Sequence, residues 1–224
     1  MRFLSSCCLS LLLAFSASVS AQAPNGELIE VAGAKAAVIL AHGRAQGPDG
    51  QVVGLLRHSI ARDAGMDTLS LQLPVLPTSD YLAYAATFPD AYKTLRGAID
   101  YLIKERQIKR IYILGYSMGA RMTTAFLAAE HPREIVGYIG IGVLEGGGNP
   151  LDANVNIQKV GVPVLDLHAD STPLDRSSAE NRKNLPNDRY TMTRIRGANH
   201  SFKGYESALS EASAVWLKQQ EAKQ

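Results

Sequence analysis

The chain has 224 residues, with 23 basic and 21 acidic side chains and a formal net charge of +2 at neutral pH. Charges that nearly balance, and that are interspersed along the sequence, argue against a nucleic-acid partner and against a polybasic membrane-binding patch. Without the N-terminal leader described next, about 200 residues remain, which is enough for one large domain with its own core.

The first 21 residues have the pattern of a secretory signal peptide. Arg2 precedes a short apolar stretch at residues 9–15, and small residues at 19–21 form a cleavage-site pattern. The apolar stretch is too short to span a bilayer stably. We therefore expect residues 1–21 to be a signal peptide, residues 22–224 to form the mature domain, and the protein to be exported to a periplasm or secreted.

Both cysteines, Cys7 and Cys8, lie inside this leader. The mature chain would then have no disulfide, no thiol nucleophile and no thiolate metal site. No later apolar run is long enough to predict a membrane span. None of the motifs described below implies a cofactor or a metal.

Beyond the leader, segments of strand and helix character alternate from residue 36 onward. Short, nearly continuous apolar runs predict buried strands, and apolar residues at helical spacing predict helices. In chain order we predict a strand at 36–41, a helix at 52–64, a strand at 68–73, a helix at 90–106, a strand at 110–114, a helix from 120, strands at 135–143, 162–167 and 190–195, and a helix at 201–219. This order predicts an α/β fold in one domain, with a mostly parallel sheet and helices on both faces.

Residues 115–119 read Gly-Tyr-Ser-Met-Gly, between a predicted strand and a predicted helix. A serine that projects its hydroxyl from so tight a turn needs a strained backbone, and glycines two positions before and after it let strand and helix approach without a Cβ clash. An ordinary glycine-bounded turn could have the same five residues. The position between strand and helix favours Ser117 as a catalytic nucleophile.

Other polar residues suited to catalysis also follow the ends of predicted strands. His42, Asp170 and His200 do so, as Ser117 does. Active sites of parallel sheets lie at the carboxyl ends of their strands. We therefore expect these side chains to gather at one edge of the sheet.

Taken together, the motifs resemble the α/β-hydrolase superfamily, and within it the small exported bacterial serine hydrolases without a large cap domain. The resemblance covers residues 36–220 and is carried by His42-Gly43, the 115–119 turn, the segment 162–170 and the loop 197–202. The order serine, acid, histidine is the order of that family's catalytic triad. The resemblance implies that Ser117 is the nucleophile, that His200 is the general base, and that the backbone N–H groups of Arg44 and Met118 form the oxyanion hole.

The acidic member of the triad has three candidates. We expect Asp170, because it follows a strand end ahead of His200. The family usually places this aspartate about four residues after a strand-end residue such as His168, which is position 172 here. Asp170 lies two residues before that position, and Asp175 lies three residues after it. Glu145, after the preceding strand, is the third candidate. Asp166 lies within a strand and is not expected to be free to orient a histidine.

The sequence thus predicts an exported serine hydrolase that cleaves a small-molecule or acyl-ester substrate through an acyl-enzyme intermediate. Amide or peptide hydrolysis and acyl transfer use the same triad and stay open. A non-catalytic envelope-binding protein on a hydrolase scaffold stays open as well. The segment that follows Glu145 is too short for a large cap, so we expect a site that is open or covered by loops, with residues 76–84 as part of its wall.

Overall fold

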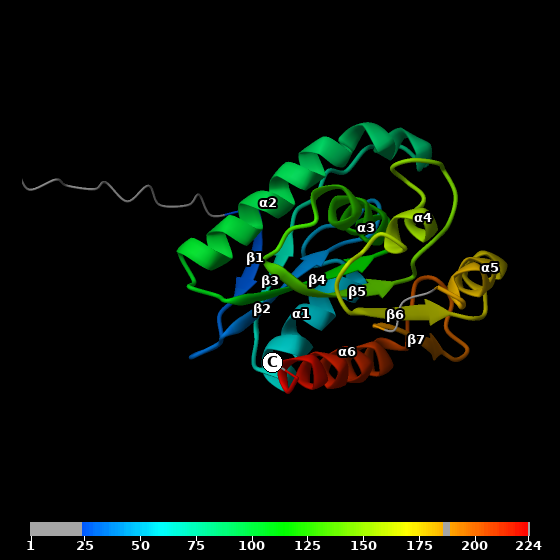
Figure 1. Ribbon diagram of the computed structural model, residues 1–224. Helices are drawn as coiled ribbons and strands as arrows, with labels where there is room; N and C mark the ends of the chain where they lie inside the picture. Colours follow the sequence, from blue (N-terminus) through cyan, green and yellow to red (C-terminus); the bar gives the residue numbers. More distant parts are fainter. Residues whose placement is uncertain (1–23, 186–188, 224) are drawn as a thin grey trace, which may run out of the picture.

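The computed structural model describes residues 24–185 and 189–223, and a seven-stranded sheet in the order β1-β3-β2-β4-β5-β6-β7 runs through it (Figure 1). The strands are β1 (Gly26–Ile29), β2 (Ala36–Ala41), β3 (Asp67–Leu71), β4 (Arg110–Tyr116), β5 (Ile135–Ile141), β6 (Val164–Ala169) and β7 (Tyr190–Ile195). Edge strand β1 is antiparallel to β3, and the other neighbours pair in parallel. The predicted α/β class and mostly parallel sheet are confirmed. The predicted signal peptide lies outside the described residues.

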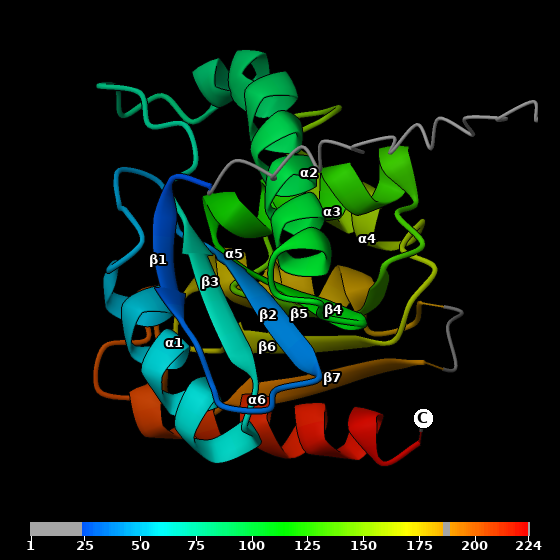
Figure 2. The ribbon, with the colours of Figure 1, turned by 90° about the vertical axis from the view of Figure 1, so that its left-hand side faces the viewer.

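Helices cover both faces of this sheet, as predicted. They are α1 (Gln51–Ala64), α2 (Phe88–Lys104), α3 (Met118–Glu130), α4 (Ala153–Ile157), α5 (Pro173–Arg182) and α6 (Glu206–Glu221), with a 3-10 turn η1 (Leu82–Thr87) before α2. Helices α1 and α6 lie side by side on one face, and α2 and α3 lie on the other (Figures 1 and 2).

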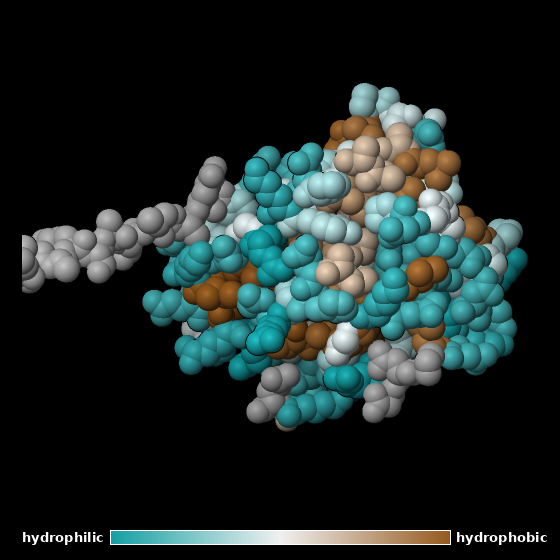
Figure 3. Space-filling model, turned by 45° about the horizontal axis from the view of Figure 1, so that its top comes forward, coloured by the Kyte–Doolittle hydropathy of each residue, from teal (hydrophilic) through white to brown (hydrophobic). Residues whose placement is uncertain are grey.

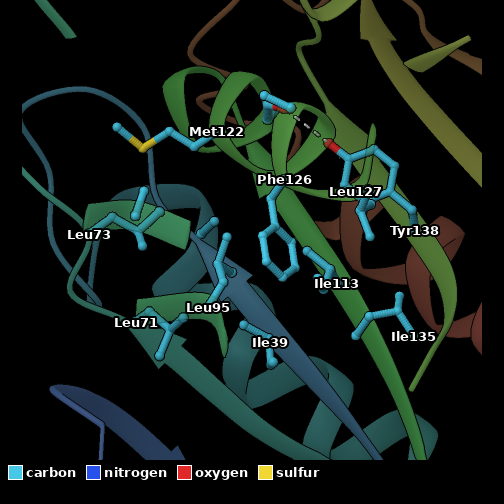
Figure 4. Close-up of a cluster of buried hydrophobic side chains, with 14 of the residues drawn as sticks. Ile39, Leu71, Leu73, Leu95, Ile113, Met122, Phe126, Leu127, Ile135 and Tyr138 are labelled. Carbon is cyan, nitrogen blue, oxygen red and sulfur yellow. Dashed lines mark hydrogen bonds between the residues drawn. The ribbon is translucent and has the colours of Figure 1, made fainter. Parts of the chain in front are cut away.

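Strand β2 contributes side chains to the apolar clusters on both faces of the sheet. Ile39 packs into the apolar cluster under α2 and α3, whereas its neighbours Val38 and Leu40 pack into the cluster against α1 and α6. Figure 4 shows the first cluster, in which Ile39 and Ile113 of the sheet approach Phe126 of α3. Because successive side chains of a strand point to opposite faces, a strand that is covered on both sides needs an uninterrupted apolar run.

Four short elements were not predicted: β1, η1, α4 and α5. The segment that forms α5 reads Pro-Leu-Asp-Arg-Ser-Ser-Ala-Glu-Asn-Arg, and its buried residues are mostly polar. Apolar spacing therefore gives no sign of this helix.

Hydrophilic side chains dominate the face shown in Figure 3, with apolar patches between them. Among the described residues, no helix has the length and apolar character that a membrane crossing requires.

Candidate active site

Ser117 lies in a strained turn between β4 and α3. Its backbone angles, φ 55° and ψ −112°, are outside the regions that residues with a Cβ ordinarily adopt. A Cβ at Gly115 would lie 2.3 Å from Oγ1 of Thr123, and a Cβ at Gly119 would lie 2.2 Å from the carbonyl oxygen of Ala41. Both positions must therefore be glycine, and the predicted steric reason for the Gly-x-Ser-x-Gly pattern is confirmed.

Three side chains from distant parts of the chain form a continuous series of hydrogen bonds. Oγ of Ser117 is 2.8 Å from Nε2 of His200, and Nδ1 of His200 is 2.8 Å from Oδ1 of Asp175. The hydroxyl of Thr172 donates to Oδ2 of the same carboxylate. With the proton of the imidazole on Nδ1, facing the carboxylate, Nε2 has a free lone pair directed at the serine hydroxyl.

Asp175, and not the expected Asp170, is therefore the acid that contacts His200. The carboxylate of Asp170 is engaged elsewhere: its Oδ1 accepts a hydrogen bond of 2.6 Å from the backbone N–H of Gly197, and its Oδ2 is 3.7 Å from the guanidinium of Arg194.

The positions of β6 and α5 explain this correction. Strand β6 ends at Ala169, two residues beyond its predicted end, so that Asp170 follows the strand directly and its carboxylate meets the N–H of Gly197. Helix α5 then starts at Pro173, and its first turn brings Asp175 to His200.

Asp175 is held in its charged form. Burial of the side chain opposes the charge, but the hydrogen bonds from His200 and Thr172 outweigh burial, and the pKa of Asp175 lies below its ordinary value. A carboxylate at this point can orient the imidazole and stabilise the imidazolium.

The other two acids considered from the sequence lie apart from His200. The carboxylate of Glu145 accepts hydrogen bonds from Ser177 and Asn181 on α5, at the wall of the cavity. Asp166 is fully buried in β6 and pairs with Arg182, as its place within a strand suggested.

The backbone N–H of Met118 is free of the helix ladder. Met118 is the first residue of α3, and the first bond of this helix runs from the N–H of Arg121 to the carbonyl of Ser117. The loop that contains Arg44 passes beside this helix end, because a Cβ at Gly119 would also lie 2.6 Å from the carbonyl oxygen of His42. Arg44 and Met118 both line the cavity at Ser117.

His42 fixes this loop rather than entering the cavity. Its buried ring accepts a 3.1 Å hydrogen bond at Nε2 from the backbone N–H of Leu73, so Nδ1 carries the proton and donates to the carbonyl of Gly43 at 2.8 Å. Burial lowers the pKa of His42, against the effect of the two backbone bonds, and keeps the ring neutral. The imidazole thereby ties the loop after β2 to the segment after β3.

The cavity at Ser117 has a volume of about 450 Å³. It is lined by Arg44, Tyr81, Ser117, Met118, Arg121, Leu144, Glu145, Gly146, Leu174 and His200. A larger groove of about 630 Å³ lies between α1 and α6, but neither Ser117 nor His200 lines it. The hydrogen-bonded serine and histidine make the smaller cavity the candidate site.

Tyr81 forms one wall of the cavity and belongs to the segment 76–84 that was expected there. Its ring lies 5.1 Å from the guanidinium carbon of Arg121. Arg121 is buried and donates to the carbonyl groups of Glu145, Gly146 and Leu151, which holds the opposite loop in place. In the part of the chain that the structure describes, no large cap covers the site, and the five-residue helix α4 occupies the connection from β5 to β6.

Sequence reasoning missed three residues that support the site. Tyr116 donates its hydroxyl to the carbonyl of His200 at 3.0 Å and stacks on the imidazole, with 5.9 Å between ring centroids. Thr172 contacts the acid, and Arg121 holds the cavity wall. Tyr116 occupies a variable position of the serine motif, where nothing in the motif identifies it.

Within residues 24–185 and 189–223, no group of three or more His, Cys, Asp or Glu side chains could hold a metal ion.

Residues 34–223 match the family model of an alpha/beta hydrolase domain, and the chain belongs to this family. No curated protein matches the sequence significantly.

Several solved structures share the fold. A dienelactone hydrolase from Anabaena variabilis superposes with a TM-score of 0.69 at 20% identity, over 87% of this chain and 90% of that one. XC6422 from Xanthomonas campestris, a serine hydrolase without a lid, superposes with a TM-score of 0.65 at 17% identity, over 87% of this chain and 84% of that one. Est1E from Butyrivibrio proteoclasticus, with ferulic acid bound, superposes with a TM-score of 0.67 at 17% identity, over 88% of this chain and 95% of that one. At these identities the likeness is one of fold.

Proposed function

We propose that this α/β hydrolase is a serine hydrolase that cleaves carboxylic esters of small molecules, with Ser117 as nucleophile, His200 as general base and Asp175 as the orienting acid. The observation that carries the proposal is the unbroken series of hydrogen bonds from Asp175 through His200 to Ser117. A serine hydroxyl is a weak nucleophile until an adjacent base takes its proton. The strained turn exposes the hydroxyl, and the histidine is within reach of its proton.

The reaction follows from this geometry. Oγ of Ser117 attacks the acyl carbon while its proton passes to Nε2 of His200. When the tetrahedral intermediate collapses, the bond from carbon to the alcohol oxygen breaks, and His200 returns the proton to the departing alcohol. A water molecule then attacks the acyl-enzyme by the same route, giving the carboxylic acid and free Ser117.

The oxyanion of the intermediate would be held by the backbone N–H groups of Met118 and Arg44. The N–H of Met118 is unused by its helix and lies at the start of α3, where the helix dipole favours negative charge. Arg44 lines the same cavity from the loop that His42 fixes. Removal of one such donor in a serine hydrolase costs about 10²- to 10³-fold in kcat.

Three observations favour esters. The cavity is small and is not covered by a large cap among the described residues, and Leu144, Leu174 and Met118 offer apolar contacts for an acyl group. One similar structure is named a dienelactone hydrolase and another a serine hydrolase without a lid.

The leader pattern at residues 1–21 supports export of the mature protein. Sequencing of the N-terminus from a host that exports the protein should find a start near Gln22. A retained Met1 in the exported fraction would reject this part of the proposal.

A series of p-nitrophenyl esters with acyl chains of increasing length tests the activity. We expect turnover of the short esters, and a loss of about three or more orders of magnitude in kcat for Ser117→Ala. Turnover by pure Ser117→Ala close to that of the wild type would reject Ser117 as the nucleophile. A folded wild-type protein that cleaves none of the esters would favour a binding role on a hydrolase scaffold.

A further inference from the structure

Helix α5 carries the acid of the proposed triad, yet it has little apolar surface with which to dock. Its buried residues are Asp175, Ser178, Ala179 and Arg182, and Leu174 is 51% exposed. Ala179 is thus the one apolar side chain in the buried set of this helix. Burial of apolar surface, which holds most helices on a sheet, contributes little here.

Polar contacts hold the helix instead. Glu145 accepts hydrogen bonds from Ser177 and Asn181 at the outer side of the helix, and the guanidinium of Arg182 makes the bonds of its buried side. Its Nε donates to Oδ2 of Asp166 in β6 at 2.8 Å, and its Nη1 donates to the carbonyl of Val143 at 2.8 Å and to Oδ1 of Asn154 at 2.6 Å. Tyr190 of β7 also donates its hydroxyl to Asp166. One side chain therefore joins α5 to β6, to the end of β5 and to α4. Figure 1 shows α5 beside the carboxyl end of β6.

Burial of both charges of this ion pair carries a large desolvation penalty. The side chains of Asp166 and Arg182 are both fully buried. Within the described part of the chain, Oδ1 of Asp166 and Nη2 of Arg182 have no hydrogen-bond partner. Buried pairs of this kind often add no net stability over apolar residues of similar volume, whereas loss of one partner is strongly destabilising. A role in fixing geometry explains the pair better than a role in stability.

Arg182 and Asp175 lie on one face of α5, seven residues apart. Seven residues are close to two full helical turns, or about 10 Å along the axis. A helix that is anchored at Arg182 therefore has its first turn directed at His200, where Asp175 and Thr172 meet.

We propose that Arg182 and Asp166 are positioning residues: their buried ion pair sets the place and rotation of α5 on the sheet, and so holds the Asp175 carboxylate against His200. The inference rests on the proposed function, because it assigns the pair a role in the catalytic geometry of that site. Arg182 acts through the helix, and its positive charge also helps to lower the pKa of Asp175. Its hydrogen bonds run to Asp166, Val143 and Asn154 and not to Ser117 or His200.

A double-mutant cycle tests the proposal. Asp166→Leu with Arg182→Met replaces both charges by apolar side chains of similar size, so that no buried charge is left alone and the protein should fold. The change Asp175→Asn is then made in the wild type and in this background, and kcat is measured with p-nitrophenyl acetate. We expect Asp175→Asn to cost about 10²- to 10⁴-fold in the wild type, and less than about threefold in the background, where the carboxylate is no longer in place.

The pH profile gives a second readout that a purely structural role would not move. In the Asp166→Leu/Arg182→Met background, the acid limb of kcat/KM should move to lower pH, because the imidazolium has lost the carboxylate that stabilises it. A smaller fraction of folded enzyme would lower the activity without moving this limb.

Two further variants keep the test decisive. Arg182→Lys preserves the positive charge, but its single nitrogen cannot occupy both the Nε position beside Asp166 and the Nη1 position beside Val143 and Asn154. It serves in the same cycle if the apolar pair does not fold. Asp67→Asn is the matched control, since Asp67 is also a fully buried strand aspartate paired with an arginine, Arg106, at the amino end of β3. Asp67→Asn should lower the free energy of unfolding, but Asp175→Asn should reduce kcat as strongly in this background as in the wild type.

The outcomes separate the two proposals. If Asp175→Asn costs as much in the altered background as in the wild type, and the acid limb stays in place, the positioning role is overturned and the proposed function stands. If Asp175→Asn has no effect in the wild type, the triad assignment and the positioning role are both overturned.

Discussion

Replacement of Ser117 by glycine should give a more stable protein than replacement by alanine, and both changes should abolish ester hydrolysis. Ser117 has φ 55° and ψ −112°, a conformation that is costly for any residue with a Cβ and open to glycine. The comparison that isolates this cost is Ser117→Gly against Ser117→Ala. Both variants lose the hydroxyl and its hydrogen bond to His200, so they differ in the Cβ alone.

The magnitude follows from two opposing effects. A residue held in so sparsely populated a conformation stores about 1–3 kcal/mol. Glycine loses more backbone entropy on folding than alanine does, at a cost of about 0.5–1 kcal/mol. The free energy of unfolding of the glycine variant should therefore exceed that of the alanine variant by up to about 2.5 kcal/mol.

Urea denaturation of the two variants at one pH measures this difference. Residue 211 supplies the control, because Glu211 is exposed in the interior of helix α6. Of Glu211→Gly and Glu211→Ala, the glycine variant should be the less stable, by about 0.5–1 kcal/mol. If glycine at 117 were less stable than alanine by a similar amount, the turn would store no strain and the argument for a strained serine would fail.

Three further changes test the site and its surroundings. Asp175→Asn should lower kcat by about 10²- to 10⁴-fold, and Asp170→Asn should cost far less, in steady-state assays with p-nitrophenyl acetate; the reverse order would return the acid to Asp170. Gly119→Ala puts a Cβ 2.2 Å from the Ala41 carbonyl oxygen, and it should lower the free energy of unfolding by about 1–3 kcal/mol and also kcat; wild-type values of both would contradict the packing argument. Because the pKa of Asp175 is lowered in the folded protein, its charge contributes stability above about pH 4 that is lost as the pH falls further. The difference in unfolding free energy between the wild type and Asp175→Asn should therefore become smaller below that pH. A difference that stays constant would contradict a stabilising charge at Asp175.

Apolar patterning was sufficient to predict the class of fold. Strand β2 is apolar throughout because both of its faces are covered, and β7 was placed with the bounds that the structure has. Helix α5 could not be found in this way, since a buried arginine, aspartate and serine form its inner face. Those contacts are made with residues far along the chain, which local spacing does not reveal.

The same helix explains why the site was predicted only in part. Ser117 and His200 are each marked by a local motif with a physical reason, and the structure brings them to 2.8 Å. The acid has no such motif. Its place depends on where β6 ends and where α5 begins, and the first turn of α5, which apolar spacing does not predict, brings Asp175 and not Asp170 to His200.

Labelling with a fluorophosphonate probe tests the central claim most directly, because only a serine activated by a neighbouring base reacts readily with it. The folded wild-type protein should gain one adduct, and peptide mass spectrometry should locate it on Ser117. Ser117→Ala should take up no label under the same conditions, while the Ser207→Ala protein should label as the wild type does. No adduct on the folded wild-type protein, or equal labelling of Ser117→Ala, would contradict the account.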